Sequence, residues 1–242
     1  WACLFGRWNA KTVQVHNASL EIHQTRHAGK VQLSKITLEL QDIAMESRAN
    51  GSMKAVVDEI NLQNNGTLRG GNLEIKTFFK LSREWLFDLL QGQISVSDVI
   101  LSQGELSLGT LSGTVDYALQ QDAADSWQLI PGAGEAAPLN QIQVRLSGRE
   151  VLNALVRSGY WNKASEQQEA SLELTASCID SDPLLALFAP EAYAWASGRF
   201  KYLQLDLHSR GRDKEDFLRN IEGRVALDIE QLNLKNSPFI EI

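Results

Sequence analysis

Apolar and polar residues alternate with a period of two along most of the chain. Between positions 203 and 208, for example, each leucine is followed by a polar residue, namely Gln204, Asp206 and His208. Such alternation gives a β-strand one apolar face and one polar face, as in antiparallel sheets. The pattern therefore predicts a mainly β protein with about a dozen short antiparallel strands. The alternating runs span 13–22, 31–40, 60–62, 73–79, 94–101, 106–108, 115–119, 142–146, 172–178, 203–207, 225–229 and 232–234.

Four other segments have apolar residues at helical spacing. Ser82 can cap a first helix that Gly92 ends, and a second is predicted over about 149–161. Pro183 opens a third, which ends at Pro190, and a short fourth is predicted over 213–220. We therefore expect three or four short helices as a minor element.

The organisation of the chain is that of one β-rich region, 1–242, with its softest stretch near 121–139. That stretch includes Pro131, Gly132, Gly134 and Pro138, and its composition fits a loop or a subdomain boundary equally well. The sequence begins without Met and ends on an apolar run at 239–242. We interpret both ends as cuts inside a longer protein, with any membrane anchor outside this fragment.

Composition narrows the class of protein. Hydrophobic residues make up 43% and charged residues 22%, as in ordinary globular proteins, so disorder and collagen are excluded. The formal net charge is −7, and the basic residues are scattered rather than clustered. Because a phosphate backbone requires a concentrated cationic surface, no nucleic-acid partner is expected.

Motifs for catalysis, cofactors and metals are weak. His23 and His27 have helical metal spacing but lie at a predicted strand end, so no metal site is expected. Asp180 and Asp182 precede a predicted helix, where acidic residues favour the dipole. No nucleotide-binding loop or nucleophile elbow is present, so we predict a non-enzymatic protein without a cofactor. Whether Cys3 and Cys178 pair is left open.

The apolar face of the predicted sheet must be covered or used. Three or four short helices are too few to cover a dozen strands, so the sheet either closes on itself or reserves part of this face for acyl chains. A filled sandwich or barrel with a closed core fits the periodicity at least as well. Both interpretations are kept.

Two patches carry a family resemblance. Near the C-terminus, the run 209–228 has a polar, Gly-containing turn, a short helix and a strand with Ile221, Gly223, Val225 and Leu227 at alternate positions. A second patch, 73–108, has a strand, a Leu-rich segment, Gly-x-Ile at Gly92 and then paired strands. Both resemble the AsmA-like family of bacterial envelope proteins, and together they cover about half of the chain.

The resemblance implies a fold and a function. It implies a curved antiparallel sheet, either a β-groove or a partly open barrel, in a periplasmic protein anchored to the inner membrane. Its apolar face would bind or conduct phospholipid in support of outer-membrane assembly, with other envelope proteins as further partners and no catalytic residues. The alternative function is a structural or protein-interaction module with a closed core and no lipid. The predicted lipid-binding residues are Leu73, Ile75, Ile94, Val96, Leu106, Leu108, Leu203, Leu205, Leu207, Val225, Leu227 and Ile229.

Overall fold

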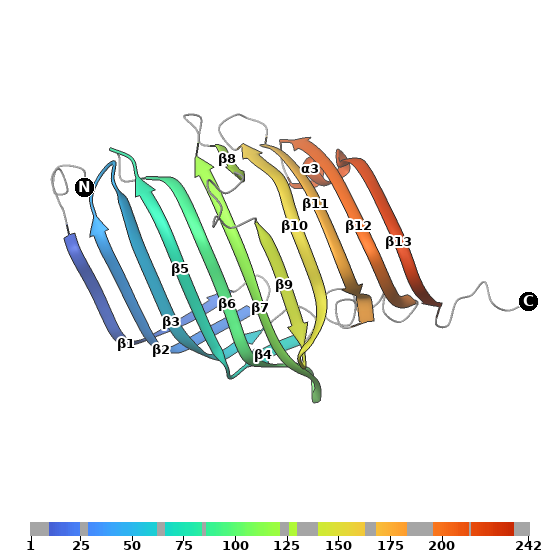
Figure 1. Ribbon diagram of the computed structural model, residues 1–242, viewed down its shortest axis with the longest axis horizontal. Coiled ribbons are helices and arrows are strands. Elements are labelled where there is room, and N and C mark those ends of the chain that lie inside the picture. The colour runs from blue at the N-terminus through green and yellow to red at the C-terminus, as the bar shows by residue number, and fades with distance from the viewer. Residues whose placement is uncertain are drawn as a thin grey trace, which may run out of the picture.

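A single antiparallel sheet of 13 strands contains nearly all of the regular structure (Figure 1). The computed structural model describes residues 10–24, 29–61, 66–83, 86–121, 126–129, 140–162, 168–182, 196–212 and 214–234. The prediction of a mainly β, antiparallel protein is confirmed. The elements are β1 (Ala10–Gln24), β2 (Gly29–Ile43), β3 (Arg48–Asn61), β4 (Gly66–Arg69), β5 (Asn72–Leu81), β6 (Phe87–Gln103), β7 (Leu106–Gln121), β8 (Ser126–Leu129), β9 (Gln141–Leu146), β10 (Arg149–Asn162), β11 (Gln168–Asp180), β12 (Ala196–Gly211), α3 (Lys214–Arg219) and β13 (Glu222–Leu234).

The strands follow one another across the sheet in chain order. β4 and β5 both lie between β3 and β6, which closes a ring of four paired strands, and β8 and β9 both lie between β7 and β10. The registers show that each pair fills successive lengths of one gap: β6 pairs with β5 up to Ser97 and with β4 from Ile100. The sheet is therefore eleven positions wide, with β1 and β13 at its edges.

Asn140 fills the gap where the chain rejoins the sheet after β8. Its side-chain oxygen accepts a hydrogen bond from the backbone N–H of Ala118 at 2.7 Å, and its carbonyl accepts one from the N–H of Val156 at 3.0 Å. Pairing continues from β7 through β9 to β10, so the sheet is unbroken beside the stretch that the sequence marked as soft. Residues 122–125 and 130–139 of that stretch lie outside the described residues.

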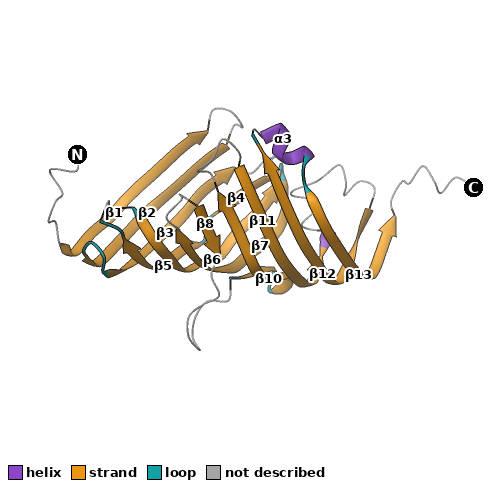
Figure 2. Ribbon diagram, turned by 90° about the horizontal axis from the view of Figure 1, so that it is seen from above, coloured by secondary structure: helices purple, strands orange, loops and turns teal. Residues whose placement is uncertain are grey.

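A line of backbone irregularities crosses β1 to β6. Asn17, Lys35, Gly71 and Asp98 all have positive φ, between 50° and 73°. The registers place them side by side, and pairing slips on β1, β2 and β6 at these points. Because bulges bend a strand and increase its twist, such a line folds the sheet. β1, β2 and β3 turn at this line and continue behind the sheet (Figures 1 and 2).

We call this line of irregularities the fold line, and Gly71 is required there. Its φ is +73°, and a Cβ atom built on it would lie 2.4 Å from the backbone oxygen of Ser97. Its own carbonyl accepts a hydrogen bond from the N–H of Val57 at 3.2 Å. A side chain at this position would therefore push β5 away from β6.

The apolar residues before the fold line and after it on a strand lie on the same face of the sheet. In β2 the apolar series runs through Leu33 and then Ile36, three positions apart, and in β6 it runs through Val96 and then Val99. The extra residue of each bulge shifts the alternation by one, so both segments keep their apolar side chains on the same face. Leu33, Ile36 and Val99 are buried together in one cluster, which packs in the corner of the fold.

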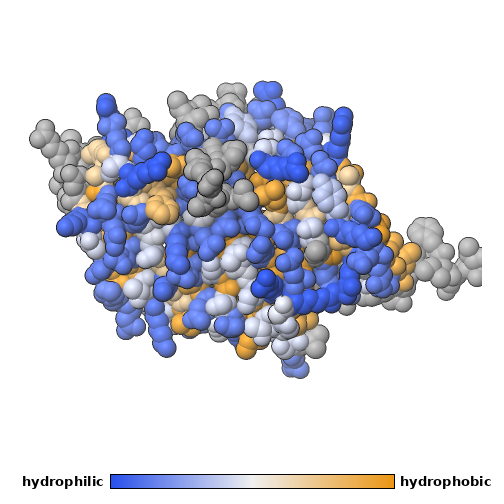
Figure 3. Space-filling model, in the orientation of Figure 1, coloured by the Kyte–Doolittle hydropathy of each residue, from blue (hydrophilic) through white to orange (hydrophobic). Residues whose placement is uncertain are grey.

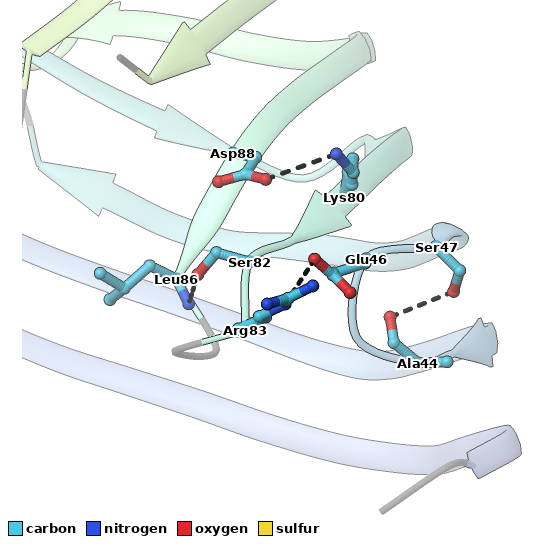
Figure 4. Close-up of polar contacts among 8 residues, drawn as sticks. All are labelled: Ala44, Glu46, Ser47, Lys80, Ser82, Arg83, Leu86 and Asp88. Atoms are coloured by element: carbon cyan, nitrogen blue, oxygen red, sulfur yellow. Dashed lines mark hydrogen bonds and ion pairs between the residues drawn. The ribbon is translucent and has the colours of Figure 1, made fainter. Parts of the chain in front are cut away.

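Helix predictions were wrong at two places. Over 82–90, Ser82 accepts a hydrogen bond from the N–H of Leu86 at 3.2 Å, which closes a turn into β6, where Phe87 to Leu90 are paired (Figure 4). Over 149–161 the chain forms β10, whose pairing slips after Glu150 and after Val156. These two bulges shift the strand alternation and so imitate helical spacing.

The fourth predicted helix is confirmed as α3, which connects β12 to β13 (Figure 2). Glu215 and Asp216 lie in its first turn and Arg219 in its last, as the helix dipole favours. The third, predicted from Pro183 to Pro190, lies outside the described residues. Within the described part of the chain, α3 is the one named helix.

Candidate apolar binding face

One row of apolar side chains crosses the whole sheet. Residues directly opposite each other in paired strands point to the same face, so the registers can be followed from β1 to β13. All eleven positions of this central row are apolar, one in each position of the sheet. The central row is Val15, Leu38, Met53, Ile75, Ile94, Val115, Ile142, Ala154, Ala176, Leu203 and Leu227. We call the face that carries it the apolar face.

The neighbouring row points to the opposite side and is polar from β2 to β13. It is Thr37, Lys54, Glu74, Ser95, Thr114, Gln143, Asn153, Ser177, Tyr202 and Asp228. Figure 3 shows a largely hydrophilic surface in the orientation of Figure 1, with hydrophobic residues scattered over it and gathered along the margin toward the C-terminus. The two sides of the sheet therefore differ in chemistry along its full width.

Burial of the apolar face is partial. Val99 is 0% exposed in the corner of the fold, whereas Leu227 is 46% and Val225 is 64% exposed. Among the described residues the apolar face is therefore sealed at the corner and around Ala154 and Ala176, and open to solvent on β13.

Most of the predicted lipid-binding residues lie on this face. Ile75, Ile94, Leu203 and Leu227 belong to the central row. Five others lie in flanking rows of the same face: Leu73 and Val96 are paired with each other, as are Leu205 and Val225, and Leu207 pairs with Gly223. Ile229 is paired with Phe200, next to a register slip.

Two predicted residues do not align with the rows. Leu108 lies where the pairing of β7 with β6 slips, between Gly109 and Ser107. It is half-buried and has no place in the central row. The side chain of Leu106 lies outside the described residues.

An apolar pocket of about 530 Å³ opens on the apolar face, at the margin where β8 begins and β10 ends. Among its described lining residues none is charged. The lining consists of Phe87, Leu90, Leu119, Trp127, Leu129, Gly159, Tyr160, Trp161, Ser171 and Leu172. Trp127 and Trp161 are direct partners in β8 and β10, and Trp161 is 46% exposed.

Gly159 keeps this pocket open. A Cβ atom at this position would lie 2.5 Å from Cδ1 of Leu129, so any side chain here would compete with the pocket wall. Phe87, on the other side, is held by an edge-to-face contact with Phe79, with ring centroids 5.7 Å apart. The pocket is thus shaped by a missing side chain and a fixed aromatic ring.

Electrostatic interactions concentrate on the polar face. Hydrogen bonds from Gln41 and Gln14 lower the pKa of Glu39. A hydrogen bond from Lys76 is the main cause that lowers the pKa of Glu74, with Lys54 adding to it. These contacts are solvent-exposed: Gln14 and Lys54 reach the carboxylates from neighbouring strands, whereas Gln41 and Lys76 lie on the same strand as the carboxylate that they contact.

One ion pair joins the two hairpin turns at the margin shown in Figure 4, and a second joins β5 to β6. Arg83 contacts Glu46 at 2.8 Å, and Lys80 contacts Asp88 at 3.6 Å. The N–H of Glu46 also donates to the carbonyl of Leu81 at 2.8 Å. The β2–β3 turn is thereby tied to the end of β5.

Three further features of the described chain concern metal ligands, a second pocket and membrane-spanning helices. The residues that the structure describes contain no cluster of three or more His, Cys, Asp or Glu able to hold a metal ion. His208, Asp216 and Glu222 line a second pocket of about 500 Å³ beneath α3, together with Arg210 and Asn220. In the described part, no helix has the length and apolar character to cross a membrane.

One signal of the bulges is visible in the sequence, namely the three-residue spacing in the apolar series. The pairing of Trp127 with Trp161 has no such signal, because it requires knowing that β8 and β10 are neighbours.

Comparison of the chain with models of protein families, with curated proteins and with solved structures finds no match.

Proposed function

We propose that the chain is a non-enzymatic envelope protein of AsmA type, in which the folded sheet forms a groove for phospholipid acyl chains. The groove would bind or conduct lipid in support of outer-membrane assembly. In this proposal the protein is periplasmic, held at the inner membrane by a segment outside this sequence. The resemblance at 73–108 and 209–228 suggests the family, and the apolar face supports the physical role.

The observation that carries the proposal is the unbroken central row. Eleven strand positions at about 4.8 Å spacing extend over about 48 Å, and all are apolar. Nine of the eleven side chains keep exposed surface, whereas Ala154 and Ala176 are buried. One leaflet of a bilayer contributes about 15 Å of hydrocarbon, so the row matches about three acyl lengths end to end. A surface of this length without a polar step lets a chain slide without losing its apolar contacts.

The energetics of such a groove need no special residue. Each buried methylene contributes about 0.8 kcal/mol, so a partly inserted acyl chain is held by contact area alone. Headgroups would stay in water, since the polar residues lie on the opposite face. Because the apolar contacts are uniform, an acyl chain would have a similar binding energy at each successive position along the central row.

The alternative is a structural or protein-interaction module with a closed core. It requires the apolar face to be sealed by the protein itself. Among the described residues the sealed apolar side chains form three clusters: the corner cluster of Leu33 and Val99, one around Phe79, and one around Ala154 and Ala176 against which Leu203 packs. Leu205 and Leu227 belong to none of these clusters and retain exposed surface, which favours the groove.

The test is lipid mass spectrometry on solvent extracts of the protein purified without detergent, beside a control protein of similar size. We expect phospholipid in a fixed ratio to the protein. Leu205→Asp should lose most of this lipid, whereas the matched variant Gln204→Asp, on the polar face of the same strand, should retain it. Circular dichroism establishes that both variants remain folded.

Extracts no richer in lipid than the control protein would contradict the groove and favour the closed module. Equal loss of lipid from the two variants would show that charge on β12, rather than the apolar face, governs retention. Unfolding of Leu205→Asp alone would place Leu205 in a core.

A further inference from the structure

We infer that the pocket between β6 and β11 is a specific seat for one hydrocarbon chain of an amphiphile, with its polar end at the Trp127–Trp161 pair. The inference rests on the proposed function and adds one defined binding site for lipid to the apolar face. It assigns the substrate class as a single-chain or two-chain amphiphile with an uncharged apolar tail.

The size and lining of the pocket support one ligand of this kind. Its volume of about 530 Å³ lies in the range of about 300–1,000 Å³ that sites for single small ligands occupy. Leu90, Leu119, Leu129 and Leu172 form its aliphatic wall. Because no described lining residue is charged, a charged group would lose its hydration there without a partner.

The position of the tryptophans indicates the direction of the ligand. Trp127 is the second residue of β8 and Trp161 is one residue before the end of β10, so both lie at the margin of the sheet. Leu129 and Gly159 lie two residues further in, toward the central row. Tryptophan is favoured where an apolar surface meets water, because its ring is apolar and its N–H is polar.

The pocket differs from the rest of the apolar face in being hollowed and aromatic. The central row offers a continuous surface of aliphatic residues, whereas here Gly159 leaves space beside Leu129 and aromatic rings bound it. A chain lying on the open face contacts one side only. A chain in the pocket is contacted from several sides and should dwell longer.

The experiment is a fluorescence titration of the purified, delipidated protein with stearic acid that carries one bromine on the carbon next to its carboxyl group, where the inferred orientation places it beside Trp127 and Trp161. Bromine quenches tryptophan only at contact. We expect saturable quenching, and we expect the double variant Trp127→Phe and Trp161→Phe to lose most of it.

A pocket-filling variant provides a second readout. Leu172 lies opposite Gly159, so Leu172→Phe should weaken the apparent affinity at least fivefold. The matched control is Ala226→Phe, on the opposite face at β13, which should leave the affinity within twofold. Lipid extraction from Ala226→Phe should yield the same amount of phospholipid as the unchanged protein.

The outcomes separate this inference from the proposed function. Quenching that rises without saturation, or that is unchanged by the double tryptophan variant, would overturn the pocket even if phospholipid is extracted. Equal weakening by Leu172→Phe and Ala226→Phe would also overturn it. Saturable quenching in a protein that retains no phospholipid would support the pocket while contradicting the groove.

Discussion

β3 and β13 have the same alternation of apolar and polar residues but opposite surroundings. β3 has neighbours on both sides, and its residues Ala49, Ala55 and Val57 are buried. β13 pairs only with β12, and all 13 of its residues are exposed. Alternation therefore determines which face a side chain joins, whereas the fold line and the neighbouring strands determine whether it is sealed.

The largest expected effect follows from the sealed corner. Val99→Asp places a charge where the side chain is 0% exposed, so we expect a loss of more than about 4 kcal/mol in the free energy of unfolding. Urea unfolding measures it. A loss below about 1 kcal/mol would show that the corner between β2, β3 and β6 is open to water.

Leu227→Asp tests the solvent-exposed strand of the comparison, β13. Because Leu227 is 46% exposed on an edge strand, stability should change by no more than about 1 kcal/mol, while retained phospholipid should fall severalfold. Ala226→Asp adds the same charge to the opposite face of β13 and is the control. Equal lipid retention by the two variants would remove β13 from the groove.

A smaller effect is expected at the fold line itself. Lys35 has φ of +50°, a conformation that costs a non-glycine residue about 1 kcal/mol, so Lys35→Gly should leave stability unchanged or raise it by up to about 1 kcal/mol. Thr37→Gly, two residues along the same strand, should lower stability by about 1 kcal/mol. Equal losses in urea would mean that Lys35 is not strained.

The smallest effect concerns the polar face. The pKa of Glu74 is lowered in the folded protein, so its contribution to stability is present above the pKa of the unfolded chain and is lost as pH falls through the folded pKa. Thermal unfolding between neutral and acidic pH should therefore show a slightly weaker pH dependence for Glu74→Gln. Parallel curves for the two proteins would indicate that Lys76 and Lys54 contribute nothing measurable.

The sequence was sufficient to predict the strands and their apolar faces, but not how the strands pair with one another. The runs at 73–79, 94–101 and 203–207 correctly indicated strands with one apolar face. The segment 149–161 predicts a helix because bulges in β10 shift its alternation. The three-residue spacing that marks a bulge also occurs in helices, so the spacing is visible in the sequence but the neighbouring strands are needed to tell the two apart.

The candidate site was predictable in part for the same reason. Leu203 and Leu227 were selected as alternating leucines, and they pair directly in the central row. Ala154 and Ala176 belong to the same row but were not selected, because alanine carries little hydrophobic signal by itself. The pocket around Gly159 depends on contacts between β8, β10 and β11, which the sequence does not place together.

The most direct test of the central claim is photocrosslinking with a phospholipid that carries a photoreactive group in its acyl chain. After irradiation, peptide mass spectrometry locates the adducts along the chain. Adducts on strands from both halves of the sheet, at apolar-face residues such as Ile94 and Leu203, are the predicted result. Adducts spread equally over polar-face neighbours such as Ser95 and Gln204, or none above an unirradiated sample, would contradict the claim that this face receives hydrocarbon.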